Sequence, residues 1–223
     1  MPSTHAIRQR RLAARRARIL AAARTLFARH GVEGATMRRL ADKVGCSAPV
    51  LYSHFADKAD LLRQLCAEDA ADLLLAMRRA ARADEPLARL RGMARAYIEH
   101  ALRRPAQFQL MFLTPFPPEE LRRISAGRTK DDPALACYAI LRESVRAALE
   151  RRALPRRPGG PDALAQALWG AAHGVVALHA ILGASPDVPW RPSRAVAREL
   201  VDAALAGWSA REPRRARTKA RRA

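Results

Sequence analysis

The segment TMRRLADKVGCSAPVLYSHFADK, residues Thr36 to Lys58, decides the fold of this chain. Its first half places four apolar residues at the i, i+3, i+4, i+7 spacing of one helix face: Met37, Leu40, Ala41 and Val44. Thr36 stands before this face as an N-cap, and Gly45 follows it, where many helices end in a left-handed residue. The pattern predicts a short helix followed by a tight turn.

The second half of the segment predicts another short helix. Ser47 offers a second N-cap, and Pro49 falls in the first turn, where its missing N–H costs little. Leu51 and Phe55, four residues apart, face inward. The outward face is small, polar and aromatic: Ser47, Ala48, Pro49, Tyr52 and His54. A helix, a tight turn and a second helix with such an outer face have the form of a helix-turn-helix DNA reader.

Two runs in and around this segment resemble the DNA-binding domain of the TetR family of transcriptional regulators. They are ILAAARTLFARHGVEGATMRRLADKVG at Ile19–Gly45 and LYSHFADKADLL at Leu51–Leu62. The second resembles the recurrent Leu-Tyr-x-His-Phe-x-x-Lys-x-x-Leu signature of that family position for position. The resemblance implies a regulator that binds a palindromic operator as a dimer, because a helix-turn-helix usually reads two half-sites roughly 34 Å apart.

The candidate DNA-binding residues follow from this assignment. Ser47, Ala48 and Pro49 begin the recognition helix, whose first residues meet base edges. The resemblance implies phosphate contacts for four further residues: Thr36, Tyr52, His54 and Lys58. Arg38 and Arg39 add phosphate or base contacts. The alternative is that these side chains are helix caps and a solvated surface.

Charge is concentrated at the two ends of the 223-residue chain, whose formal net charge is +20. Six arginines lie between Arg8 and Arg18, and the tail 212–223 is also basic. We expect residues 1–15 to form a disordered basic arm. Two alternatives stay open for this arm: it inserts into a minor groove of DNA, or it is an ordinary solvated tail. A positive surface suits a nucleic-acid partner, although an Arg-rich composition can also reflect genome base content.

The remaining composition favours a cytoplasmic, all-α protein. Three cysteines, Cys46, Cys66 and Cys137, show neither metal-ligand spacing nor a disulfide framework. No apolar run near the N-terminus predicts a signal peptide. Residues 163–185 are uncharged and long enough to span a bilayer, but Gln166, His173 and the abundance of Ala and Gly favour a buried helix.

We predict two domains and about nine helices. Residues 16–62 form a three-helix DNA-binding domain, with the helix-turn-helix at 36–55 and a first helix at 16–30. Residues 63–211 form a helical effector-binding and dimerisation domain. Its helices are expected at about 57–82, 86–103, a short piece after 105, 132–152, 162–182 and 193–211. Three prolines predict a loop over 114–130, with a short turn at 119–124.

The second domain carries a candidate ligand pocket and a candidate dimer interface. RRPAQFQLMF at Arg103–Phe112 and LWGAAHG at Leu168–Gly174 are similar to a TetR C-terminal subclass with a Trp-x-x-x-His-Gly motif. Aromatic residues and one titratable group suit an apolar effector site: Tyr97, Phe108, Met111, Phe112, Trp169 and His173. Each could instead be a core residue. Two apolar stripes on 162–182, with one on 193–211, predict a four-helix interface between two chains, against a monomer with 162–182 central in its core.

These observations predict a ligand-responsive repressor that binds DNA as a homodimer and responds to a small, mostly apolar effector. The sequence contains no Gly-rich phosphate loop, paired carboxylates or nucleophile motif, so neither an enzyme, a cofactor nor a metal site is expected. Two alternatives remain: a sequence-nonspecific basic DNA-binding protein, and a helical small-molecule-binding protein that does not read DNA.

Overall fold

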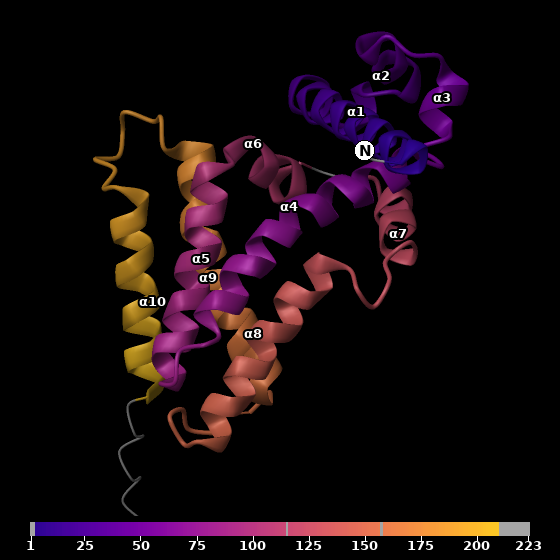
Figure 1. The fold of residues 1–223 in the computed structure, drawn as a ribbon. Coiled ribbons are helices and arrows are strands. Elements are labelled where there is room, and N and C mark those ends of the chain that lie inside the picture. The colour runs from indigo at the N-terminus through magenta and orange to yellow at the C-terminus, as the bar shows by residue number, and fades with distance from the viewer. Residues whose placement is uncertain (1–2, 115, 157, 210–223) are drawn as a thin grey trace, which may run out of the picture.

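The computed structural model describes residues 3–114, 116–156 and 158–209, and every regular element in these ranges is helical. Ten α-helices and one short π-helical segment stack into a small head and a longer bundle (Figure 1). The predicted all-α fold is confirmed. The basic tail expected at 212–223 lies outside the described residues.

The head contains α1 (Thr4–Gly34), α2 (Met37–Val44) and α3 (Ala48–Tyr52). Leu51 and Phe55 are buried in one core with Leu26, Phe27 and Leu40, as the apolar spacing predicts. Ile19 and Leu20 complete this core from α1 and are fully buried. The second and third helices are therefore held in place by the C-terminal half of the first.

The expectation of a disordered arm over residues 1–15 is wrong for residues 4–15, because α1 begins at Thr4 rather than near Arg16. Residues 1–2 lie outside the described residues. The backbone N–H of Ala6 donates to the Ser3 hydroxyl, which caps the helix. Ala and Arg are strong helix formers, and no Gly or Pro lies between Thr4 and His30. The predicted stop at Gly31 appears as a kink with φ 66°, after which the helix continues to Gly34.

Helix α4 (Lys58–Ala80) joins the head to the bundle. Leu61, Leu62 and Leu65 belong to the core of the head, whereas Leu73 and Met77 belong to the core of the bundle. The helix begins after Asp57, whose carboxylate accepts the backbone N–H of Asp60 at 2.8 Å. The domain boundary drawn at residue 62 falls inside this helix.

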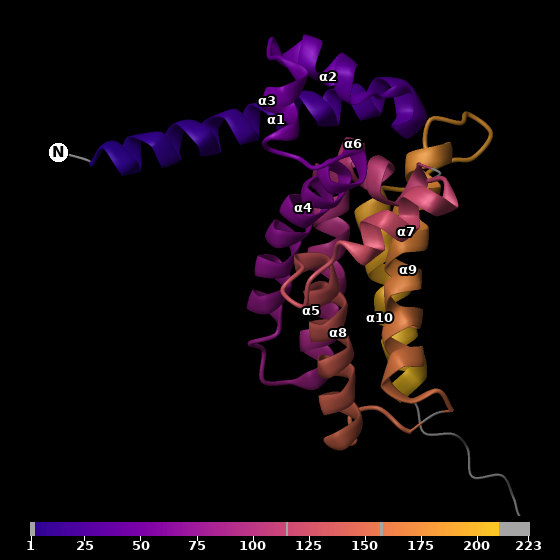
Figure 2. The same cartoon turned by 90° about the vertical axis from the view of Figure 1, so that its right-hand side faces the viewer.

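The bundle consists mainly of α5 (Pro86–Arg103), α8 (Pro133–Glu150), α9 (Gly160–Leu182) and α10 (Ser193–Ser209), packed beside the distal part of α4 (Figure 2). The helix expected at 193–211 is described as far as Ser209. Within the described residues, α9 is the helix that has the length and apolar character of a membrane span. It packs on α5, α8 and α10, and Leu164, Leu168 and Val175 are buried there, as expected for a core helix.

Between α5 and α8 the chain returns to the head through α6 (Pro105–Phe108), the π-helical segment η1 (Gln109–Leu113) and α7 (Pro118–Ala126). The loop predicted over 114–130 therefore contains a nine-residue helix. Pro118 occupies its first turn, where proline is tolerated, and Glu119 and Glu120 there suit the helix dipole. Ile124 of α7 is buried in the core of the head.

Candidate DNA-binding face and ligand cavity

Local geometry fixes the angle between α2 and α3. The Thr36 hydroxyl accepts the backbone N–H of Arg39 at 3.2 Å, which caps α2. Gly45 ends α2 at φ 72°, a left-handed conformation that strains other L-residues. Ser47 precedes α3 without making a side-chain cap hydrogen bond. Its hydroxyl is therefore left at the surface at the start of the helix.

The structure places the candidate DNA-binding residues on the outer face of the head. Seven of the nine are exposed: Thr36, Arg38, Arg39, Ser47, Ala48, Pro49 and Tyr52. Tyr52 is 51% exposed although it is a large apolar residue, so packing does not account for it. His54 and Lys58 are half-buried, and the Lys58 ammonium donates to the Val32 carbonyl oxygen at 3.3 Å. In Figures 1 and 2, α2 and α3 lie at one end of the molecule, and the C-terminal ends of α4 and α8 lie at the other.

A cavity of about 210 Å³ lies inside the bundle, between α4, α5, η1, α8 and α9. Five of the six candidate ligand residues line it: Tyr97, Phe108, Met111, Phe112 and Trp169. His173 does not line it but lies behind it, where Nδ1 is 2.7 Å from the Tyr97 hydroxyl. The His173 ring also lies 5.1 Å from the Phe112 ring and 5.2 Å from the Phe108 ring, measured between centroids. His173 therefore orients the aromatic wall.

Polar groups at the cavity are few, and burial keeps most of them neutral. Burial raises the pKa of the Cys66 thiol to about 11 and that of the Cys137 thiol to about 12. Burial, with Arg104 nearby, lowers the pKa of His100, and burial lowers the pKa of His173. Arg128 brings a guanidinium group to the lining, and its Nε lies 3.9 Å from the Asp132 carboxylate. The cavity thus suits an apolar molecule with an acceptor or anionic group.

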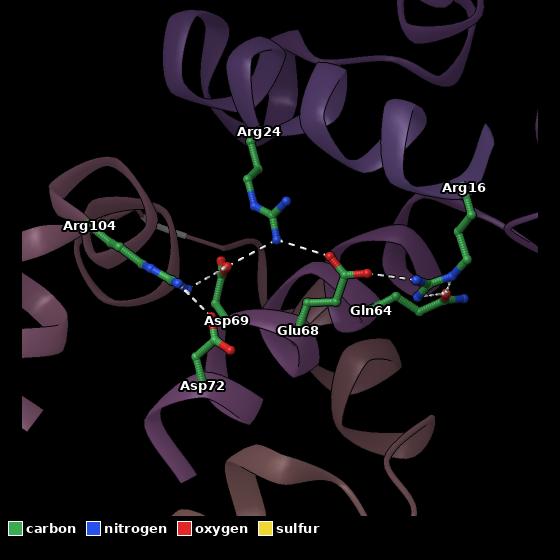
Figure 3. Close-up of polar contacts among 7 residues, drawn as sticks. All are labelled: Arg16, Arg24, Gln64, Glu68, Asp69, Asp72 and Arg104. Atoms are coloured by element: carbon green, nitrogen blue, oxygen red, sulfur yellow. Dashed lines mark hydrogen bonds and ion pairs between the residues drawn. The ribbon is translucent and has the colours of Figure 1, made fainter. Parts of the chain in front are cut away.

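A polar network joins the head to the bundle along α4 (Figure 3). Arg16 of α1 donates to Gln64 and, at 2.6 Å, to Glu68. Arg24 of α1 donates to Glu68 at 3.1 Å and to Asp69 at 3.0 Å. Arg104, between α5 and α6, approaches the same Asp69 carboxylate and pairs with Asp72. Two separate parts of the chain, α1 and the α5–α6 junction, therefore converge on one side of α4.

Asp69 is the centre of this network because its carboxylate meets both Arg24 and Arg104. Its side chain is buried, since the residue is 3% exposed. Burial raises the pKa of its carboxyl, while the guanidinium groups of Arg24 and Arg104 oppose that rise. The charge of Asp69 consequently depends on both arginines remaining in place. Cys66, Ala70 and Leu73, on the same helix, line the ligand cavity. One helix therefore contacts the cavity and holds the head.

The segment α6–η1 makes a second connection between cavity and head. Phe108, Met111 and Phe112 line the cavity, whereas Leu110 is buried in the core of the head. Gln109–Leu113 is wound as a π-helix. Within these five residues, Leu110 lies in the core of the head and Met111 and Phe112 line the cavity. Such π-segments often occur at functional sites.

Helices α9 and α10 leave an apolar face uncovered. Its exposed apolar residues include Leu178, Ile181 and Leu182 of α9 and Leu200 of α10. Ile181 is 66% exposed, which is unusual for this side chain. Gly170 and Gly174 lie on the same helix and have open space where a Cβ would be. Within α10 the buried stripe is Ala197, Val201 and Leu205, and Leu200 faces outward.

Sequence reasoning missed the polar network and most of the residues that line the cavity. Asp69 interrupts an apolar stripe between Leu65 and Leu73, and a carboxylate at that position is a signal of a buried ion pair. Arg128, Tyr138 and the two cysteines line the cavity from α4, α8 and the loop before α8. No local motif marks them, because they meet only after the bundle folds.

Comparison with known proteins agrees with this architecture. Residues 19–65 match the family described as bacterial regulatory proteins, tetR family, and residues 90–204 match the tetracyclin repressor-like C-terminal domain. These matches cover both the head and most of the bundle. The chain belongs to the TetR family of bacterial regulatory proteins.

Individual relatives are similar over shorter stretches. The HTH-type transcriptional repressor AcnR of Corynebacterium diphtheriae is 52% identical over 60 residues, which are 27% of this chain and 32% of that protein. The HTH-type transcriptional activator FasR of Mycolicibacterium smegmatis is 31% identical over 99 residues, 44% of this chain and 45% of that protein. The match thus spans less than half the length of either relative.

A solved structure extends the likeness to the whole fold. The transcriptional regulator FadR of Bacillus subtilis, in complex with stearoyl-CoA, superposes with a TM-score of 0.69 over 85% of this chain and 97% of that one. Its sequence identity is 14%, so this likeness concerns the fold alone.

Removing the buried carboxylate should weaken the junction between head and bundle. We expect Asp69→Asn to lower the free energy of unfolding by about 1–3 kcal/mol, because Arg24 and Arg104 lose their shared partner but can be partly rehydrated. Urea denaturation followed by circular dichroism measures this change. The matched control is Glu119→Gln, which breaks exposed pairs with Arg122 and Arg123 and should cost about 0.5 kcal/mol or less. An equal loss of unfolding free energy in the two variants would contradict the role of Asp69 in joining the head to the bundle.

Proposed function

We propose that the chain is a cytoplasmic, homodimeric transcriptional regulator that represses a palindromic operator and releases it when a small apolar ligand binds. The exposed outer face of α2 and α3 would read the operator. The observation that carries the proposal is that α4 and η1 each contact the ligand cavity and the head at once. A ligand that changes the position of either segment must change the position of the head as well.

Ser47, Ala48 and Pro49 would meet base edges, because they begin α3 and are exposed. Ala48 and Pro49 have no hydrogen-bonding side chain, so they would contact a thymine methyl group. Thr36, Arg38, Arg39, Tyr52, His54 and Lys58 would contact phosphates around them. Sequence preference would then depend on few direct hydrogen bonds, and phosphate contacts would supply most of the affinity.

The effector would be an apolar molecule with one anionic or acceptor group. Aromatic and aliphatic side chains form most of the cavity wall, and Arg128 would bind the polar end. FadR of Bacillus subtilis, which shares this fold, was solved in complex with stearoyl-CoA, and an acyl chain is one apolar ligand that such a cavity wall would take. A cavity of about 210 Å³ would take a short ligand or part of a longer one.

Release of the operator requires the ligand to prefer the conformation that does not bind DNA. A coupling free energy of about 1–3 kcal/mol, a factor of about 5–150 in operator affinity, is typical of such switches. Ligand binding between Phe112, Trp169 and α4 would move η1 and α4, and the network around Asp69 would carry that movement to α1.

Dimerisation would occur through the apolar face of α9 and α10, which is the four-helix arrangement predicted from the sequence. Two copies related by a two-fold axis would cover Ile181, Leu182 and Leu178 of each chain. Gly170 and Gly174 would let the two α9 helices approach closely.

Replacing Tyr52 tests DNA binding. An operator is first selected from a pool of random duplexes, and its affinity is measured by fluorescence anisotropy beside that of a scrambled duplex. We expect Tyr52→Ala to weaken binding to both duplexes about 10- to 100-fold, since the variant cannot make a charge-assisted hydrogen bond to a phosphate. Tyr52→Phe isolates the hydroxyl, and Leu121→Ala on α7 controls for removal of an exposed apolar side chain. If wild-type protein bound both duplexes equally, the nonspecific DNA-binding alternative would hold.

Effector binding can be separated from its transmission to the head. We expect medium-chain and long-chain fatty acids to raise the melting temperature and to release the operator more strongly than the corresponding alcohols, because Arg128 pairs with a carboxylate. Leu110→Ala should keep the shift in melting temperature and abolish most of the release, because Leu110 contacts the core of the head rather than the cavity. Arg128→Gln should remove the difference between acid and alcohol. A ligand panel that shifts neither quantity would count against an effector in this cavity.

A charge on the apolar face should separate the two protomers. We expect Ile181→Arg to convert the dimer to a monomer in sedimentation equilibrium, because two unpaired arginines would be buried at the interface. Leu121→Arg introduces the same charge at a residue that is 52% exposed on α7, and should leave the dimer intact. A monomeric wild-type protein would refute this interface.

A further inference from the structure

The first twelve residues of α1, Thr4–Arg15, form a helix that projects from the head without packing on the rest of the protein (Figure 2). All of them are exposed except Ala6, which is half-buried. The first buried residue of the helix is Ile19. At about 1.5 Å per residue, Thr4 lies roughly 22 Å along the helix axis from Ile19. This helical arm, residues Thr4–Arg15, extends at the same end of the molecule as α2 and α3.

The charge of the helical arm is uniformly positive. Arg8, Arg10, Arg11 and Arg15 are exposed around it, and Arg18 follows. The first acidic residue of the chain is Glu33, beyond the kink at Gly31. No carboxylate on the arm itself neutralises these arginines. A rod with this charge is complementary to a polyanion.

The distribution of apolar residues argues against a protein or lipid partner. Ile7 and Leu12 are the large apolar residues of the arm, and both are exposed. Five residues of α-helix separate them by about 140° around the axis, so they do not share one face. A membrane-binding helix needs a continuous apolar face opposite its basic one. The arm has no such face.

The direction of the arm is fixed relative to the head. Arg16 lies where the arm meets the head, and its guanidinium holds Gln64 and Glu68 of α4 (Figure 3). The same guanidinium lies 6.0 Å from the centre of the Phe55 ring, next to α3. Since α1 continues unbroken from this contact to Thr4, the arm keeps one orientation relative to α3.

We propose that the helical arm binds the phosphate backbone of DNA beside the half-site read by α2 and α3. A helix with side chains is about 10–12 Å across and a minor groove about 6 Å wide, so this arm cannot enter the groove as an extended arm could. It contributes affinity without reading sequence, and it lengthens the DNA segment that each protomer covers. This inference rests on the proposed DNA binding.

The test compares wild-type protein with a variant that carries Arg8→Gln, Arg10→Gln, Arg11→Gln and Arg15→Gln. Glutamine keeps the helix propensity and removes the charge. The control variant carries Arg79→Gln, Arg82→Gln, Arg146→Gln and Arg156→Gln. These residues are exposed and lie near the C-terminal ends of α4 and α8 in the sequence. Those helix ends point away from the head (Figure 1). Operator and scrambled duplexes are titrated between about 50 and 300 mM salt, and hydroxyl-radical footprints are recorded.

The arm variant should bind the operator at least tenfold more weakly near 150 mM salt. Its plot of log K against log salt should be shallower by about 0.9 for each phosphate that the arm no longer neutralises, on both duplexes. Footprint protection should disappear from the flanks of the operator and persist at its centre. The control variant should match wild type. Exchanging A·T for G·C pairs in the flanks should leave wild-type affinity unchanged, because the arm does not read bases.

Several results would overturn the proposal. One is that the arm variant keeps the wild-type salt slope and footprint. Another is that the control variant loses as much DNA affinity as the arm variant. The third is that the base composition of the operator flanks strongly changes wild-type affinity. Binding of wild type, but not of the arm variant, to vesicles of anionic lipid, together with unchanged DNA binding, would assign the arm to membranes instead. Failure of the proposed function is distinct: wild type would then prefer no duplex, while the salt slopes would still report whether the arm binds phosphates.

Discussion

The carboxylate of Asp69 is the point on which the arrangement of head and bundle depends. It is buried on α4, and it is balanced by Arg24 from the first helix and Arg104 from the end of α5. Burying one carboxylate is unfavourable without these partners, and each arginine comes from a different part of the chain. The pairing therefore specifies one docking of α1 on α4. The Arg16 contacts at the other end of the same helix face prevent rotation about that point.

Helix α4 carries the Asp69 pairing on one side and residues that line the cavity on another. It is therefore the shortest physical path between the cavity and the head. The segment α6–η1 provides a parallel path, with Phe108 in one core and Leu110 in the other. Two links between the same pair of sites restrict the head to movements that both allow.

Much of this architecture could be predicted from the sequence, because it follows from local signals. Thr36, Gly45 and Asp57 mark helix ends through their own side chain or φ angle, and Leu51 and Phe55 mark a face by spacing. The aromatic wall from Tyr97 to Trp169 was also predicted. Prediction was wrong for the arm, where absence of apolar periodicity suggested disorder although helix propensity was high. Arg128 and the Asp69 network depend on contacts between distant segments, which single-sequence patterns do not contain.

The two cysteines that line the cavity, Cys66 and Cys137, are expected to have low chemical reactivity. Thiolates, not thiols, react with peroxides and electrophiles, and burial keeps Cys66 and Cys137 protonated at neutral pH by raising the pKa of each thiol. The Cys137 sulfur lies 3.6 Å from the Ala70 carbonyl oxygen, to which it donates its proton. The cavity therefore presents sulfur as a soft, uncharged packing atom. These two thiols of the cavity are therefore less reactive toward oxidants than an ionised cysteine would be.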